Sequence, residues 1–210
     1  MPLFYQQNIS KSTKLAIWKI EEQESFFLSK VPLQREITHP HKRVQHLAGR
    51  YLLPLLFPDF PYEEIEIANT RKPFLRSERY HFSISHCNDY AAAIVSSDCR
   101  VGIDVEFKTK RLQNIKGKFL HEDELSFVHQ NTDSTQLDLL TVLWSAKEAI
   151  YKWYGAGFVD FSEMMRTFPF SIKEEGHLNA AFMKNEFKQK LLLNYKLLDG
   201  LTLVWLHSEI

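Results

Sequence analysis

Two acidic residues share one face of a predicted strand. Asp104 and Glu106 alternate with the apolar residues Val101, Ile103 and Val105, which is the pattern of a strand with one buried face. Side chains two residues apart project from the same face, about 7 Å apart along the strand. Two carboxylates this close repel each other unless a cation lies between them, and oxygen ligands suit Mg²⁺. On this spacing alone, two solvated acids are the simpler interpretation and a magnesium site is the functional one.

A third carboxylate stands on a helix that otherwise belongs in a core. Residues 137–154 have helical periodicity and are apolar over most of the circumference. Trp144, Glu148 and Lys152 are four residues apart and share one stripe, with Lys147 beside Glu148. Either the buried charges pair with each other, which contributes about 0.3–0.5 kcal/mol, or they serve a ligand. Because the helix has almost no polar face, we favour a ligand and metal-assisted phosphate chemistry.

Composition excludes several classes of function. The 26 basic and 26 acidic side chains balance in 210 residues, so the chain lacks the net positive charge of a nucleic-acid binder. Cys87 and Cys99 form neither a disulfide framework nor a CxxC metal pair, which favours a reduced, cytoplasmic setting. We find no signal-peptide pattern in residues 1–10 and no apolar run of ~18 residues. We therefore expect a cytoplasmic protein that binds neither nucleic acid nor membrane.

The remaining patterns predict an α+β fold. Strands are expected over residues 14–20, 63–68, 80–86, 90–95, 100–107, 171–172, 180–182, 190–197 and 201–207, and helices over residues 21–30, 41–57, 121–128 and 137–154. Pro54 should kink the second helix or end it early. Gly102 should leave the acidic face of its strand open for a bulky ligand. Because both halves repeat the order of elements, we predict two similar α/β lobes, residues 1–107 and 108–210. Asp104 and Glu106 then belong to the first lobe and Glu148 to the second, so we expect the active site in the cleft between the lobes.

Three segments in this order resemble the signature of the 4′-phosphopantetheinyl transferase superfamily. Residues 101–106 (VGIDVE) are similar to its GxDxE motif, and residues 144–152 (WSAKEAIYK) are similar to its WxxKEAxxK motif. Lys72-Pro73 followed by residues 82–86 (FSISH) resembles its KP…FSxSH segment. The length resembles the larger, surfactin-synthetase-activator type, a pseudo-dimer in one chain that we expect to be monomeric. The resemblance implies Mg²⁺-dependent or Mn²⁺-dependent transfer of phosphopantetheine from coenzyme A to a serine of an apo acyl- or peptidyl-carrier protein, releasing adenosine 3′,5′-bisphosphate.

The resemblance also implies roles for individual residues. Asp104, Glu106 and Glu148 hold the metal ion, Glu148 is the base, and Lys152 stabilises the departing phosphate. The expected contacts to coenzyme A come from Arg50, Arg71, Lys72, Ser85, His86, Asp104, Lys147 and Lys152. Glu124 resembles an acid that supports the lysine side of the site. Two departures are Cys87, where Ser or Thr is more usual, and the absence of a lysine between Gly155 and Gly157.

Two other functions compete with this one. A non-catalytic module of the same fold could hold coenzyme A or a carrier protein, although binding alone does not need all three acids and both lysines. Another Mg²⁺-dependent nucleotide enzyme would need a glycine-rich phosphate cradle, and the sequence has none. The basic residues 108–118 form either a solvated linker between the lobes or a patch for an acidic carrier protein.

Overall fold

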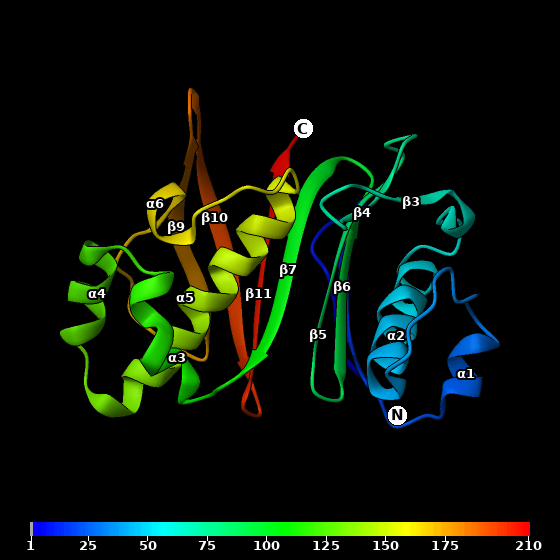
Figure 1. Ribbon diagram of the computed structural model, residues 1–210, viewed down its shortest axis with the longest axis horizontal. Coiled ribbons are helices and arrows are strands. Elements are labelled where there is room, and N and C mark those ends of the chain that lie inside the picture. The colour runs from blue at the N-terminus through cyan, green and yellow to red at the C-terminus, as the bar shows by residue number, and fades with distance from the viewer. Residues whose placement is uncertain (1) are drawn as a thin grey trace.

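The computed structural model describes residues 2–210 and contains two main antiparallel sheets (Figure 1). The first has the order β1-β2-β6-β5 and is built from β1 (Leu3–Asn8), β2 (Thr13–Lys19), β6 (Tyr90–Ser96) and β5 (His81–Cys87). The second has the order β7-β11-β10-β9-β8 and is built from β7 (Cys99–Phe107), β11 (Leu201–Glu209), β10 (Phe187–Leu198), β9 (Glu175–Lys184) and β8 (Met165–Thr167). A third, two-stranded sheet joins β3 (Ile65–Ile67) to β4 (Pro73–Leu75).

Two long helices cover these sheets. α2 (Pro40–Leu56) lies on the first sheet, and α5 (Asp133–Tyr154) lies on β7 and β11 of the second. The shorter helices are α1 (Glu24–Leu28), η1 (Tyr62–Glu64), α3 (Arg111–Ile115), η2 (Lys116–Lys118), α4 (Glu122–His129) and α6 (Phe161–Met164). In the part of the chain that the structure describes, no helix meets the length and hydropathy that a membrane span requires.

Alternation along the strands explains how the layers form. On β2, Ala16 and Trp18 pack in a core with α2, whereas Leu15 and Ile17 face a second core that they share with Ile103 of β7. Successive side chains of a strand point to opposite faces, so one strand contributes to both cores. The two sheets therefore pack against each other, and each carries a long helix on its outer face.

The sheets also meet along their edges, where β5 lies beside β7. The backbone N–H of Ile103 donates to the Ser83 hydroxyl at 3.2 Å, and the backbone N–H of Val105 donates to the Ser85 hydroxyl at 3.3 Å. The two serine hydroxyls thus accept the hydrogen bonds that the backbone oxygens of a neighbouring strand would otherwise accept. This seam places Ser85 of β5 next to Asp104 of β7.

Most predicted elements are confirmed. Pro54 does not end α2 early, because it lies in the last turn, where only one backbone hydrogen bond is lost, while a kink at Pro54 stays a prediction. Within residues 108–118, residues 111–118 form α3 and η2 rather than a solvated linker, because Leu112 anchors them in a core, while a patch for a carrier protein stays a prediction. Residues 171–172 form no strand. The short strands β1, β4 and β8 were not predicted.

The mixture of helices and antiparallel sheets is confirmed, while the division into two lobes stays a prediction. β7, which the division after residue 107 assigns to the first lobe, hydrogen-bonds to β11 along its whole length. By sheet membership, the chain changes from the first sheet to the second between β6 and β7.

Candidate active site

A cavity of about 270 Å³ lies where β5, β7 and α5 meet. Its polar lining comes from Ser85, His86, Asp104, Glu106, Glu148 and Lys152, with Trp144 beside them. The predicted stripe of Trp144, Glu148 and Lys152 on α5 is confirmed, because all three residues line this cavity. The predicted common face of Asp104 and Glu106 is confirmed in the same way.

Gly102 brings α5 close to the acidic strand. A Cβ atom at this position would lie 2.2 Å from the backbone oxygen of Ala149 and 2.9 Å from Cβ of Trp153. The space beside Gly102 is therefore filled by the helix backbone, and the prediction that it stays open for a ligand is wrong. The close approach places Glu148, one residue before Ala149, over the same face of β7 as Asp104.

Lys152 connects two of the polar residues that line this cavity, Asp104 and Ser85. Its Nζ donates to Asp104 Oδ1 at 2.7 Å and to the Ser85 hydroxyl at 2.8 Å. The Ser85 hydroxyl, which accepts from Lys152, donates its own proton to Asp104 Oδ1 at 2.8 Å. The other oxygen of Asp104, Oδ2, is buried and has no partner among the described residues.

Glu148 faces the cavity without a hydrogen bond or ion pair to any residue in the described range 2–210. Burial raises its pKa to about 7, helped by the charges of Asp104 and Glu106 and opposed by Lys152. A carboxylate with a pKa near neutrality and no partner can exchange a proton with a ligand at ordinary pH.

The thiol of Cys87 keeps a hydrogen bond at a position where the resemblance leads us to expect a hydroxyl. Cys87 Sγ donates to Glu106 Oε1 at 3.0 Å, and the same oxygen accepts from the backbone N–H of Phe107 at 3.2 Å. Burial, together with the bond to Glu106, raises the pKa of the Cys87 thiol to about 12. Cys87 therefore remains a neutral donor that orients Glu106.

The donor chemistry of the cavity fits a divalent cation, since carboxylate oxygens suit Mg²⁺ and Asp104 Oδ2 has no partner. The positions of the carboxylates do not form a complete metal site. Within residues 2–210, no three His, Cys, Asp or Glu side chains are grouped closely enough to hold a metal ion. The ligand set Asp104, Glu106 and Glu148 therefore stays a prediction.

A second cavity, of about 260 Å³, adjoins the first and is rich in basic side chains. The two share Ile84, His86 and Lys152. Four predicted coenzyme A contacts besides Lys152 line it, namely Arg50, Arg71, Lys72 and His86. The lining residues that were not predicted as contacts include Arg35, His46, Thr70 and Tyr151. His46 precedes Arg50 by four residues on α2, so the two share one face of the helix, and this spacing would have predicted that His46 lies near Arg50.

Arg50 is buried and incompletely paired. The residue is 3% exposed, and its Nη1 has no hydrogen-bond partner among the described residues. Burial lowers the pKa of Arg50, and burial together with Arg50 and Arg35 lowers the pKa of His46 to about 4. A buried guanidinium without an acidic partner is costly unless an anion reaches it. The geometry therefore suits a phosphate or carboxylate group in this cavity.

Lys72 adds positive charge to the second cavity, whereas His86 lines it as an imidazole that is mainly uncharged at neutral pH. Burial lowers the pKa of Lys72 to about 8, assisted by the charge of Arg100. Lys72 Nζ makes one long hydrogen bond, to the backbone oxygen of Trp153 at 3.4 Å. Burial, and next the charge of Lys152, lower the pKa of His86.

Lys147 has a different role from the predicted one. It is 0% exposed and lines neither cavity. Four oxygens lie within hydrogen-bond distance of its Nζ and share its three N–H donors: Glu124 Oε2 and the Phe119 oxygen at 2.6 Å each, the Phe161 oxygen at 2.9 Å and the Met165 oxygen at 3.1 Å. The prediction that Lys147 contacts coenzyme A is wrong for this geometry, because four oxygens surround its ammonium group.

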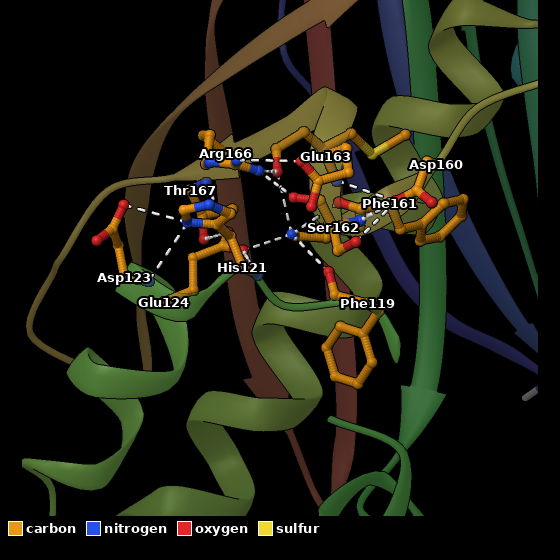
Figure 2. A network of polar contacts seen from close by, with 12 residues as sticks. Phe119, His121, Asp123, Glu124, Asp160, Phe161, Ser162, Glu163, Arg166 and Thr167 are labelled. Atoms are coloured by element: carbon orange, nitrogen blue, oxygen red, sulfur yellow. Dashed lines mark hydrogen bonds and ion pairs between the residues drawn. The ribbon is translucent and has the colours of Figure 1, made fainter. Parts of the chain in front are cut away.

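The same network fixes Glu124, as Figure 2 shows. Glu124 Oε1 accepts from the backbone N–H and the hydroxyl of Thr167, and Oε2 accepts from the backbone N–H of His121 at 2.8 Å. The Glu124–Lys147 pair thereby joins α4, α5, α6 and β8 around one buried ion pair. Since it positions α5, it supports the residues that line the cavity.

Comparison with known proteins points to one family. Residues 100–202 match the sequence model of the 4′-phosphopantetheinyl transferase superfamily. A protein of Aneurinibacillus migulanus named as a 4′-phosphopantetheinyl transferase is 30% identical over 113 residues, which are 53% of this chain and 46% of the relative. Enterobactin synthase component D of Escherichia coli is 30% identical over 130 residues, which are 57% of this chain and 60% of the relative.

A Haemophilus influenzae protein provisionally named as a 4′-phosphopantetheinyl transferase is 29% identical over 137 residues, which are 62% of this chain and 57% of the relative. The chain thus spans roughly half the length of the relatives that it matches. These similarities support the 4′-phosphopantetheinyl transferase superfamily and do not distinguish its types.

Proposed function

We propose that this chain is a 4′-phosphopantetheinyl transferase, which transfers the phosphopantetheine group of coenzyme A to a serine of an apo acyl- or peptidyl-carrier protein. The observation that carries the proposal is the pair of adjoining cavities. The basic cavity, of about 260 Å³, is lined by unneutralised cations, and the acidic cavity, of about 270 Å³, is lined by three carboxylates. Lys152 lines both. A ligand with phosphates at both ends of its nucleotide half suits this arrangement.

The basic cavity would hold the nucleotide end of coenzyme A. Arg50 offers a buried, unpaired donor for a phosphate, and Lys72, Arg71 and His86 line the same space. The pyrophosphate would then lie toward Lys152, at the border of the two cavities. An ammonium group at this position offsets the negative charge that develops on the phosphate of the departing adenosine 3′,5′-bisphosphate.

In the acidic cavity, Glu148 would act as the base for the attacking serine. Its pKa of about 7 and its lack of a partner suit a group that accepts a proton at neutral pH. Ser85 and Asp104 hold Lys152 in place. Asp104, Glu106 and Glu148 would hold a Mg²⁺ or Mn²⁺ ion, which neutralises charge on the pyrophosphate when it is bound.

We further propose the two-lobe pseudo-dimer of the larger, surfactin-synthetase-activator type, acting as a cytoplasmic monomer. Two sheets that each carry one long outer helix support the two-lobe description. The free thiols of Cys87 and Cys99 are in keeping with a reducing compartment.

Mass spectrometry of a carrier protein tests the activity. An apo-carrier incubated with the protein, coenzyme A and Mg²⁺ should gain the mass of phosphopantetheine. Glu148→Gln should lower the rate by about 100-fold or more, because a positioned base contributes about that much. Glu186→Gln, at an exposed residue that lines neither cavity, is the matched control and should leave the rate unchanged.

The same experiment separates this function from the alternative, a module that binds coenzyme A or a carrier protein without transferring the group. If coenzyme A binds but none of several acyl- and peptidyl-carrier proteins gains mass, the binding module is the correct description. Transfer by Glu148→Gln at the wild-type rate would contradict the assignment of the base.

A further inference from the structure

The ammonium group of Lys152 lies beside the carboxylates of the acidic cavity and pairs with one of them. Its Nζ lies 2.7 Å from Asp104 Oδ1, and the Asp104 side chain is only 7% exposed. The other acids in the cavity, Glu106 and Glu148, have no ion pair among the described residues. Lys152 is thus the cation that offsets this group of carboxylates in the structure.

The ammonium group of Lys152 can also reach the basic cavity. Lys152 is 24% exposed and lines the basic cavity as well as the acidic one. A lysine side chain has a flexible four-carbon stem and a compact charge, so rotation of its side chain moves the ammonium group without moving the helix. Asp104 and an anion bound in the basic cavity would therefore compete for one ammonium group.

We propose that Lys152 is an internal counter-ion that occupies the carboxylate group until coenzyme A draws it away, so that a divalent cation binds after or together with coenzyme A. The inference rests on the proposed function, because it names coenzyme A as the anion that attracts Lys152. It explains why three acids face one cavity while the described residues form no metal-binding group.

Electrostatics supply the coupling. Mg²⁺ binds carboxylate oxygens at about 2.0–2.1 Å. A divalent ion on Asp104 would therefore lie very close to the Lys152 ammonium group, and the two cations would repel each other. Phosphates in the adjoining cavity relieve the repulsion, because they give Lys152 another anion. By linkage, coenzyme A must raise the affinity for the divalent cation by the same factor as the cation raises the affinity for coenzyme A.

Binding of Mn²⁺ alone tests the proposal without any turnover. Free Mn²⁺ is measured by electron paramagnetic resonance during titration of the protein, with and without coenzyme A. In the wild type, coenzyme A should raise the affinity for Mn²⁺ by about tenfold or more. In Lys152→Met, Mn²⁺ should bind about tenfold more tightly than to the wild type when no coenzyme A is present, and the effect of coenzyme A should shrink.

Three controls keep the result interpretable. Lys190→Met, at an exposed lysine that lines neither cavity, should behave as the wild type. Asp104→Asn should lose Mn²⁺ binding in the Lys152→Met background, which shows that the ion sits at this carboxylate. Lys152→Gln repeats the test if Lys152→Met unfolds, as judged by circular dichroism.

The outcomes distinguish this inference from the proposed function. Unchanged Mn²⁺ affinity in folded Lys152→Met and Lys152→Gln overturns the counter-ion, even if the wild type transfers phosphopantetheine. Tighter Mn²⁺ binding in both variants supports the counter-ion, even if the wild type proves unable to bind coenzyme A. In that case the proposed function fails, and another anion must draw Lys152 away.

Discussion

At the scale of single residues, two lysines five positions apart on α5 have opposite fates. Lys147 is surrounded by oxygens of its own fold, whereas Lys152 lines both cavities. Residue type and spacing do not distinguish them, because both lie in one motif on one helix. The difference comes from Glu124 of α4, which forms an ion pair with Lys147 and not with Lys152.

Removal of the Lys147 charge should destabilise the fold strongly. Lys147→Met leaves the buried Glu124 without its cation and should lower the free energy of unfolding by about 3–5 kcal/mol. The double variant Lys147→Met/Glu124→Gln should recover part of this loss, since neither charge then remains buried. Urea unfolding measures both values. A single variant within about 0.5 kcal/mol of the wild type would contradict the role of this pair.

Glu148→Gln should stabilise the ion-free protein in a pH-dependent way. The pKa of Glu148 is raised from 4.5 to about 7, mainly by burial, so the folded state binds this proton more tightly than the unfolded chain does. Stability of the wild type therefore falls as the pH rises through that range. Glutamine has no such loss, so the variant should gain about 1–3 kcal/mol at about pH 8 and much less at about pH 5. Thermal unfolding in the presence of a chelator measures the difference, and an equal gap at both values would show that Glu148 titrates normally.

At the scale of elements, the site depends on how closely α5 lies on β7. Gly102 has no side chain, and any Cβ there would meet the Ala149 oxygen. We expect Gly102→Ala to destabilise the protein by about 1–3 kcal/mol, because the helix backbone must shift, and to reduce activity by moving Glu148. Gly117→Ala is the control, since a Cβ at Gly117 meets nothing within 4 Å. Chemical unfolding compares the two variants, and similar stabilities would show that this close approach is not important.

Elements with a strong local signal were predictable, and elements that depend on neighbours were not. The stripe on α5 and the alternation on β7 come from spacing within one element. By contrast, β8 is only three residues long and exists because it pairs with β9. Ile172 is of a strand-forming type, yet the backbone N–H of Lys173 beside it donates to the Tyr195 hydroxyl instead of to a neighbouring strand.

At the scale of the whole molecule, the seam between β5 and β7 joins the edges of the two sheets, beside the apolar core that the sheets share. Ser83→Ala removes the acceptor of the buried Ile103 N–H and should cost about 1–3 kcal/mol. The exchange of that amide hydrogen should accelerate as well. Ser126→Ala, at an exposed serine of α4, should change neither quantity. Unchanged protection of Ile103 in Ser83→Ala would show that the seam does not depend on this bond.

The amino-acid sequence alone determined which side chains share a face, and the tertiary structure decided what each face meets. Spacing was enough to place Glu148 with Lys152 and Asp104 with Glu106, since helix and strand periodicity are local properties. Spacing could not show that Lys152 pairs with Asp104, that Glu124 holds Lys147, or that Arg50 is left without an acid. These outcomes depend on contacts between residues far apart in the chain: the packing of β5, β7 and α5 pairs Lys152 with Asp104, the packing of α4 on α5 pairs Glu124 with Lys147, and the packing of α2 buries Arg50.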